Sequence, residues 1–165
     1  MKRGTIILGL DPGTATTGWG VIEVVRGENI HIAHGCIETP AKTELSLRLN
    51  DIAIQLNKLL KTYKPDSVAV EEIFFYNNVS TAISVAQARG VLIQTAASHH
   101  LPVHGYTPLQ VKQAVTGYGA ADKQQMQKMI KMVLGLSEVP TPDDAADALA
   151  IAVTCAHSSK MEAIK

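Results

Sequence analysis

Acidic residues at three places along the chain have the type and spacing that metal-assisted chemistry requires. Asp11 ends an apolar, β-branched run, TIILGLD, directly before a Pro-Gly turn. Glu71 ends a second such run, SVAVE, where a carboxylate is costly to bury unless a positive charge meets it. Asp144 and Asp147 are three residues apart, so they project from one face of a helix. Carboxylate oxygens suit Mg²⁺, which prefers hard ligands.

The same acids also have ordinary structural explanations. Acidic residues in the first turn of a helix favour its dipole, which accounts for Asp143 and in part for Asp144. That explanation fits Asp147 less well, because an entirely apolar run, Ala148–Val153, follows it. Asp143 projects away from the face that carries the other two acids. For Asp11, the ordinary explanation is a turn-forming Asp that bonds nearby backbone amides.

Glu71 and Glu72 are adjacent, and only one of them can lie beside Asp11. Successive side chains of a strand point to opposite faces of the sheet. We select Glu71, since acids at the ends of neighbouring strands must share a face to meet, although alternation alone does not prove it. Two metal ions held by such acids activate a water molecule and stabilise the leaving oxygen in phosphodiester hydrolysis. The pattern therefore favours a nuclease with two Mg²⁺ ions, for which Mn²⁺ is expected to substitute.

The remaining residue types offer no competing catalytic pattern. The sequence contains no Ser/His/Asp, Cys/His or zinc-type spacing, and its two cysteines, Cys36 and Cys155, are far apart within apolar stretches. Both are expected to be buried free thiols. The 15 basic residues balance the 15 acidic ones, so DNA binding would need a local basic face.

Periodicity predicts the elements that must position these acids. β-branched and apolar runs between turns predict strands at Thr5–Asp11, Thr17–Val25, Asn29–Thr39, Ser67–Glu71 and Leu101–Tyr106. Apolar stripes and Pro signals predict helices from Thr43 up to Pro65 and at Asn78–Ser98, Pro108–Val115, Asp122–Leu134 and Pro142–His157. The order βββαβαβααα indicates an α/β layer fold with a mixed sheet.

Length and composition predict one domain. The 165 residues, 46% of them apolar, suit a single core, which we place at residues 1–158 with a flexible tail over residues 159–165. The opening sequence reaches a Gly/Pro turn almost at once, so it resembles neither a leader peptide nor a membrane span. We therefore expect a cytoplasmic protein with no membrane partner.

Five segments, taken together and in this order, resemble the RuvC family of bacterial crossover junction endodeoxyribonucleases: LGLDPGTATTGWG, VAVEEIFFYNN, AQARGV, VKQAVTGYGAADK and DDAADALAIA. The resemblance extends from about Ile6 to His157. It implies a ribonuclease H-like mixed five-stranded sheet flanked by helices. It also implies a homodimer that resolves Holliday junctions, which are four-way DNA junctions, by paired symmetric nicks, in contact with the RuvA-RuvB branch-migration complex. The residues matching the family's catalytic, metal-binding acids are Asp11, Glu71, Asp144 and Asp147.

The resemblance also suggests residues that bind DNA. Phe74 matches an aromatic that stacks on bases near the crossover, although a single aromatic of this kind could equally pack in a core. Lys112 and Lys123 match basic positions near the scissile phosphates, and Arg89 lies in the AQARGV segment. Taken singly, a lysine on a helix is usually solvated, so these assignments depend on the family.

A flat helix face offers a candidate dimer contact. Ala82, Ala86 and Gly90 recur at four-residue steps, which lets another helix approach closely, although in a monomer this face could pack on the sheet instead. Two other functions compete with cleavage. A non-cleaving junction-binding protein would gain nothing from acids facing phosphate. DPGT followed by TTG also resembles the first phosphate loop of sugar kinases and actin-like ATPases, but the chain is too short for those proteins and lacks their second loop.

Overall fold

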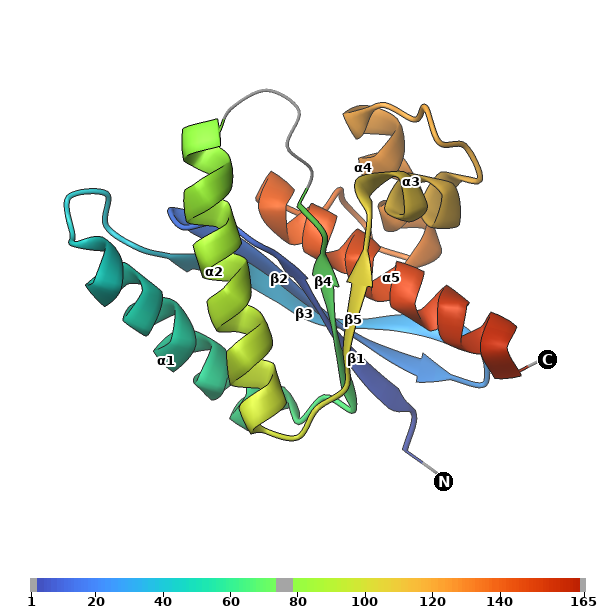
Figure 1. Ribbon diagram of the computed structural model, residues 1–165. Helices are drawn as coiled ribbons and strands as arrows, with labels where there is room; N and C mark the ends of the chain where they lie inside the picture. The colour runs from blue at the N-terminus through green and yellow to red at the C-terminus, as the bar shows by residue number, and fades with distance from the viewer. Residues whose placement is uncertain (1–2, 74–78, 164–165) are drawn as a thin grey trace.

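The computed structural model describes residues 3–73 and 79–163, and within them the predicted order of elements is confirmed (Figure 1). The strands are β1 (Thr5–Asp11), β2 (Thr16–Val25), β3 (Glu28–Glu38), β4 (Ser67–Glu71) and β5 (Val103–Tyr106). The helices are α1 (Leu45–Tyr63), α2 (Val79–Ser98), α3 (Pro108–Thr116), α4 (Lys123–Val133) and α5 (Asp143–Ala163). The predicted bounds differ from these by no more than two residues, except at the end of α5.

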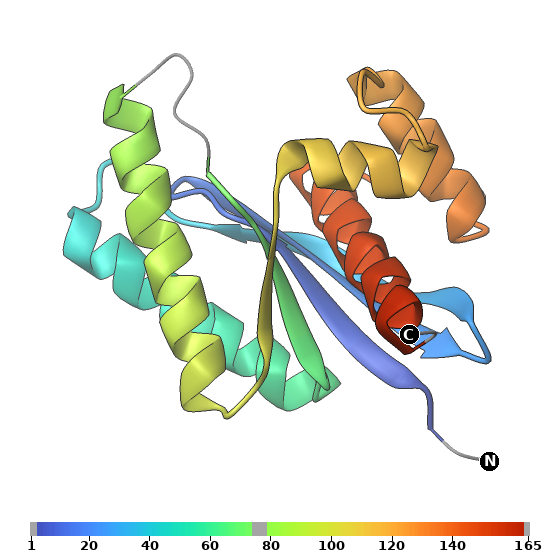
Figure 2. The same ribbon diagram turned by 45° about the vertical axis from the view of Figure 1, so that its right-hand side comes forward.

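The strands form one mixed five-stranded sheet, as predicted, and the structure shows their order to be β3-β2-β1-β4-β5. The pairs β1–β2 and β2–β3 are antiparallel, whereas β1–β4 and β4–β5 are parallel. Helices α1 and α2 cover one face of the sheet, and α5 covers the other, with α3 and α4 beside it (Figure 2). The central strands β1 and β4 are therefore buried on both faces, which explains their nearly continuous apolar sequences.

The alternation of side chains along β1 and β4 decides which acids can meet. Leu10 and Val70 pack in the core beneath α1 and α2, whereas Ala69 packs beneath α5. Because neighbouring side chains point to opposite faces, Asp11 and Glu71 lie on the α5 face. Both residues end their strands at the same edge of the sheet, because β1 and β4 run parallel.

Helix α5 lies unusually close to the sheet because glycines occupy β1 and β2 beneath it. A Cβ on Gly18 would overlap the carbonyl oxygen of Asp144, and one on Gly20 would overlap the side chain of Leu149. A Cβ on Gly9, which pairs with Gly20, would overlap the helix backbone as well. Gly18 pairs with the last residue of β1, so the close approach delivers the first turn of α5 directly to Asp11.

Two predictions about the end of the chain need correction. Helix α5 continues to Ala163 rather than ending at His157, so residues 159–163 of the predicted tail are helical. The hydroxyl groups of Ser158 and Ser159 bond carbonyl oxygens four residues earlier, at 3.1 and 3.0 Å, which keeps these polar residues within the helix.

No helix among the described residues has the length and apolar character that crossing a membrane demands.

The two cysteines differ in burial. Cys155 is 1% exposed in the core of α5, as predicted. Cys36, in β3, is only half-buried, so the prediction of a buried thiol is wrong there. Its strand lies at the edge of the sheet, where one side has no neighbouring strand to cover it.

Candidate active site

The four predicted acids come together where β1 and β4 end and α5 begins. One carboxylate oxygen each from Asp11, Asp144 and Asp147 lies within 4.8 Å of the other two. The side chain of Glu71 is hydrogen-bonded to that of Asp11, which brings the fourth acid into the same cluster. These residues are separated by up to 136 positions in the sequence, so only the packing of α5 against the sheet unites them.

The turn after Asp11 is held by hydroxyl groups that the sequence analysis did not single out. The Thr17 hydroxyl donates to the carbonyl oxygen of Gly13 at 2.7 Å and closes the turn. The Thr14 hydroxyl donates to the carbonyl oxygen of Ser84 in α2 at 2.8 Å, so the turn is also tied to that helix. The run of threonines in TATTG was the available signal, because buried hydroxyls must find backbone partners.

Burial and mutual repulsion raise the pKa values of Asp11, Glu71 and Asp147. Burial is the largest cause for Asp11, whose pKa rises to about 8, and the charges of Glu71 and Asp147 raise it further. The pKa of Glu71 rises to about 7, again mainly through burial and then through the charge of Asp147. Burial also raises the pKa of Asp147. The cluster is thus short of positive charge, and a bound cation would favour the ionised forms.

The donor set fits a hard divalent metal ion. The cluster presents carboxylate oxygens, which are the ligands that Mg²⁺ and Mn²⁺ prefer, and the three Asp oxygens are close enough to share an ion. Partly buried acids with raised pKa values are also a common mark of a functional site. Asp11, Asp144 and Asp147 could therefore share a metal ion at this edge of the sheet, and Glu71 lies beside them through its hydrogen bond to Asp11.

Glu72 and Asp143, the neighbours of two clustered acids, lie elsewhere. A Cβ on Gly105 of β5 would meet Glu72 Oε1 at 2.8 Å, and Glu72 therefore packs over β5 rather than joining the cluster. Asp143 is exposed and pairs with Lys123 through a 2.8 Å contact. That contact is the main reason why the pKa of Asp143 is lowered. Asp143 therefore has an ordinary ion-pairing role at the start of α5.

The two predicted DNA-binding lysines lie beside the cluster. Lys112 and Lys123 line a hollow of about 250 Å³, together with Glu71 and Asp147. Lys123 begins α4 and is exposed, while Lys112 projects from α3 and is half-buried. The hollow therefore combines carboxylates that can hold cations with amines that attract phosphate.

Arg89 makes a contact that its sequence context did not predict. Its Nε donates to the main-chain carbonyl oxygen of Glu71 at 2.9 Å, and its side chain is half-buried. This hydrogen bond joins α2 to the last residue of β4. Binding of DNA by Arg89 stays a prediction, and Phe74, the predicted stacking aromatic, lies outside the described residues.

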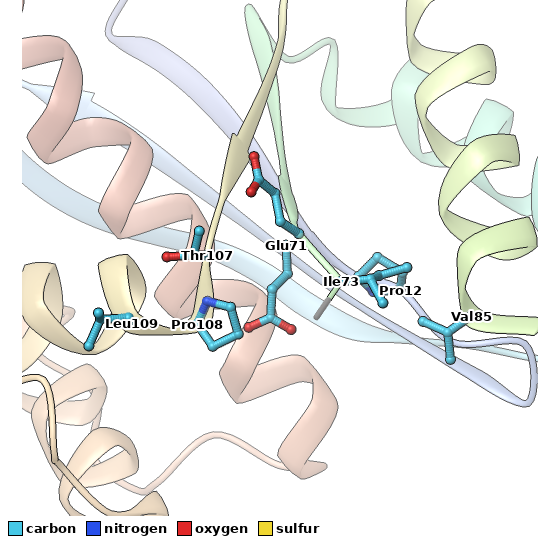
Figure 3. A pocket seen from close by; sticks show the side chains of 8 residues that line it. Pro12, Glu71, Ile73, Val85, Thr107, Pro108 and Leu109 are labelled. Carbon is cyan, nitrogen blue, oxygen red and sulfur yellow. The ribbon is translucent and has the colours of Figure 1, made fainter. Parts of the chain in front are cut away.

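A larger hollow of about 610 Å³ shares Glu71 and Pro108 with the smaller one. Figure 3 shows Pro12, Ile73 and Val85 on one wall and Pro108 and Leu109 on the other, with Glu71 between them. The sequence of Thr107 and Pro108 predicted only the start of α3. Their position in this hollow depends on where α3 packs, which cannot be predicted from local sequence.

The outer face of α2 carries the residues considered as a dimer contact. The buried residues of α2 are Ala88, Leu92, Thr95 and Ala96, so its sheet-facing side is a different one. Gly90 has open space around its Cα, and Ala86 is exposed. The alternative in which this face packs on the sheet is therefore wrong. Ile83, 53% exposed on the same helix, adds apolar surface outside the core.

Comparison with known proteins supplies a family for this chain. A family model described as "Crossover junction endodeoxyribonuclease RuvC" matches residues 7–155. A protein of that description from Syntrophomonas wolfei is 56% identical over 94% of this chain and 90% of its own length. Another, from Heliobacterium modesticaldum, is 54% identical over 93% of this chain and 94% of its own.

Solved structures agree with these matches. Thermus thermophilus RuvC in complex with a Holliday junction substrate is 35% identical, with a TM-score of 0.91 and 96% of both chains covered. The yeast mitochondrial Holliday junction resolvase shares the fold, with a TM-score of 0.72 over 99% of this chain and 82% of its own, at only 15% identity. The predicted ribonuclease H-like fold, with its mixed five-stranded sheet, is therefore confirmed.

Proposed function

The chain belongs to the RuvC family of crossover junction endodeoxyribonucleases, and from this premise we propose that it resolves Holliday junctions at the cluster formed by Asp11, Glu71, Asp144 and Asp147. The observation that carries the assignment of the site is the convergence of these acids from β1, β4 and α5. The protein is an enzyme that nicks DNA during recombination and repair, and the cluster is where we place the chemistry.

We propose that the resident metal is Mg²⁺, with two ions in each site and Mn²⁺ as a substitute. When bound, Mg²⁺ supplies positive charge that lowers the pKa of an attacking water molecule and stabilises the charge that develops on the phosphate oxygens. The four acids hold the ions as carboxylates. Support comes from the all-carboxylate donor set and from the raised pKa values of Asp11 and Glu71, which mark a site that needs cations.

Lys112 and Lys123 orient the substrate in this proposal. Both line the hollow that also contains Glu71 and Asp147, which supports contacts between their ammonium groups and the sugar-phosphate backbone. Contacts of this kind position the backbone without reading the sequence. Ionic attraction to phosphate also predicts that junction binding weakens as salt concentration rises.

The test of the proposed site is cleavage of an end-labelled synthetic four-way junction by the wild type and by Asp11→Asn, with Mg²⁺ or with chelator. We expect symmetric, Mg²⁺-dependent nicks by the wild type, and junction binding without nicks by the variant. Full activity of Asp11→Asn would refute the assignment of the cluster. Tight binding without nicks by the wild type, across several junction sequences, would instead indicate a non-cleaving binder.

We further propose that the protein acts as a homodimer through the outer face of α2. Two opposed strands need two identical sites, which two-fold symmetry supplies. The exposed Ile83 and the open surroundings of Gly90 favour this face as the contact. Ile83→Glu should give monomers by light scattering and nicks on one strand only. Ile54→Glu, at a 46% exposed position on α1, is the matched control that should stay dimeric.

The remaining parts of the proposal rest on family membership. We propose that the protein works in the cytoplasm on chromosomal DNA, and that it contacts the RuvA-RuvB branch-migration complex at the junction. Addition of that complex to the cleavage reaction should change the rate or the position of nicking. An unchanged rate and cleavage pattern would argue against this partner.

A further inference from the structure

Two histidines of strand β3 are in direct contact at the edge of the sheet. His31 Nε2 and His34 Nδ1 are 2.8 Å apart, and the centroids of the two rings are 4.9 Å apart. One nitrogen donates a hydrogen that the other accepts. Both side chains are half-buried, and in the described part of the chain β3 has no neighbouring strand on its outer side. A small solute can therefore reach the pair.

A β-bulge brings the two rings together. Strict alternation would place residues three apart on opposite faces of a sheet. The pairing of β3 with β2 shifts between His31 and Ala33, so Ile32 has no residue opposite it. This extra residue puts His31 and His34 on one face. That face is the one covered by α5, because His34 pairs with Gly20, which lies directly beneath that helix.

The pair has the charge state that binding of a cation requires. Burial, and then the neighbouring His34, lowers the pKa of His31, so its ring is uncharged at neutral pH. An uncharged imidazole keeps a lone pair on one ring nitrogen, and this is the form that binds metal ions. Within residues 3–73 and 79–163 neither histidine forms an ion pair with an acid, so no contact of that kind favours the protonated form.

A buried oxygen on the same face lacks a partner. Asn29 and His31 are two residues apart in the regular part of β3, so their side chains point to the same side of the sheet. Asn29 Oδ1 is buried and has no hydrogen-bond partner among the described residues. Because a buried acceptor without a donor is costly, this oxygen marks a place where a further group can bind.

We propose that His31 and His34 bind one divalent cation of the zinc type, with water in the remaining positions and Asn29 Oδ1 accepting a hydrogen bond from a bound water molecule. Imidazole nitrogens favour Zn²⁺, Cu²⁺ and Ni²⁺, whereas the carboxylate cluster favours Mg²⁺, so the two sites differ in their choice of metal. The site is independent of the proposed cleavage of junctions.

The geometry of the pair needs little change to accept the ion. Zn–N bonds of about 2.0–2.1 Å in a tetrahedral arrangement place two ligand nitrogens about 3.3 Å apart. His31 Nε2 and His34 Nδ1, now 2.8 Å apart, must therefore separate by only about 0.5 Å. The hydrogen between them moves to the far nitrogen of its own ring, so each ring stays uncharged and presents one lone pair to the ion.

The experiment is a titration of the full chain with Zn²⁺ in saturating Mg²⁺, followed by calorimetry and by NMR of the imidazole nitrogens. We expect one Zn²⁺ per chain at this pair and shifts of the His31 Nε2 and His34 Nδ1 resonances. His31→Ala and His34→Ala should each weaken binding by at least about tenfold, equivalent to about 1.4 kcal/mol. His104→Ala, at an exposed histidine of β5, is the matched control and should bind as the wild type does.

Further variants separate this site from other ligands for Zn²⁺. Cys36 follows His34 by two residues, and Asp11 belongs to the carboxylate cluster. Cys36→Ser and Asp11→Asn should both keep the shifts of the two histidines. His34→Gln retains a side chain that can form hydrogen bonds but removes the imidazole, so it should lose Zn²⁺ affinity as His34→Ala does. Thermal melting verifies the folding of each variant.

Three outcomes would overturn the inference. The first is a wild type in which Zn²⁺ shifts neither His31 nor His34. The second is Zn²⁺ affinity that survives in His31→Ala and His34→Ala, and the third is wild-type affinity in His34→Gln. Cleavage of a four-way junction with Mg²⁺ tests the proposed function separately, so failure of either proposal leaves the other standing.

Discussion

Helices α5 and α2 cover opposite faces of the same sheet, and they differ in how firmly they are held. The glycines of β1 and β2 bring α5 so close that a single added Cβ at Gly18 would overlap its backbone. Helix α2 buries one side in the core but leaves Ile83 and Gly90 open. The close contact fixes two acids of the site, and the open face is free for a partner. Helix α5 therefore fixes the positions of catalytic acids, whereas helix α2 offers an exposed surface.

The largest effect should come from the acids that α5 delivers. Asp147→Asn removes a carboxylate from the cluster, and loss of several kcal/mol of transition-state stabilisation corresponds to a rate lower by about 10³-fold. Asp143→Asn, at an exposed acid on the same helix, is the matched control and should change the rate by less than about tenfold. Single-turnover junction cleavage measures both. Similar losses in the two variants would mean that the rate does not depend on which of these two acids of α5 lies in the cluster.

Helix α2 should influence the site through one hydrogen bond. Arg89 holds the main chain of Glu71, so Arg89→Ala should let the end of β4 move and raise the Mg²⁺ concentration needed for half-maximal cleavage by about 10–100-fold. Arg89→Lys, which keeps a donor and the charge, should restore part of the loss. If Arg89 acts only by binding phosphate, the variant will instead weaken junction binding in chelator and leave the Mg²⁺ requirement unchanged.

A pair of glycine substitutions tests the difference in packing directly. Gly18→Ala should lower the free energy of unfolding by about 1–3 kcal/mol, since the added methyl group has no space beneath α5. Gly90→Ala meets no atom within 4 Å, so it should raise the stability of the monomer by roughly 0.5–1 kcal/mol through better helix propensity. Urea denaturation measures both, and a destabilising Gly90→Ala would show that α2 is packed more tightly than its contacts indicate.

The last prediction concerns pH. In the metal-free protein the folded state keeps protons on Asp11 and Glu71, up to pKa values of about 8 and 7, that the unfolded chain releases near pH 4. Stability should therefore fall as pH rises through this interval, and Mg²⁺ should restore it most at the upper end. Each kcal/mol corresponds to roughly 2–4 °C in a chain of this size.

Melting temperatures at pH 5, 6.5 and 8, with Mg²⁺ and with chelator, measure this dependence. Asp11→Asn is the reference, because it removes one titrating group from the cluster and should flatten the curve measured in chelator. A wild-type curve no steeper than that of Asp11→Asn would contradict the raised pKa of Asp11.

Local sequence determined the element order and most boundaries of this protein. Apolar residues recur every two residues along a strand and every three to four along a helix, so a short stretch of sequence is enough to recognise either element. The end of α5 was missed because two serines and a lysine after His157 look like a terminus, although serine hydroxyls can bond within a helix. The acids were identified through their motifs, whereas the choice of Glu71 over Glu72 was settled only by the faces on which the residues of β1 and β4 pack.

Only the tertiary structure decided what surrounds those acids. The contact of Arg89 with Glu71, the pairing of Lys123 with Asp143 and the two hollows that meet at Pro108 join residues from separate elements. The spacing of residues along one helix or strand does not predict how close another element will pack. That distance is set by side-chain volume across the interface, here by the missing Cβ atoms beneath α5, and it is a property of the folded packing.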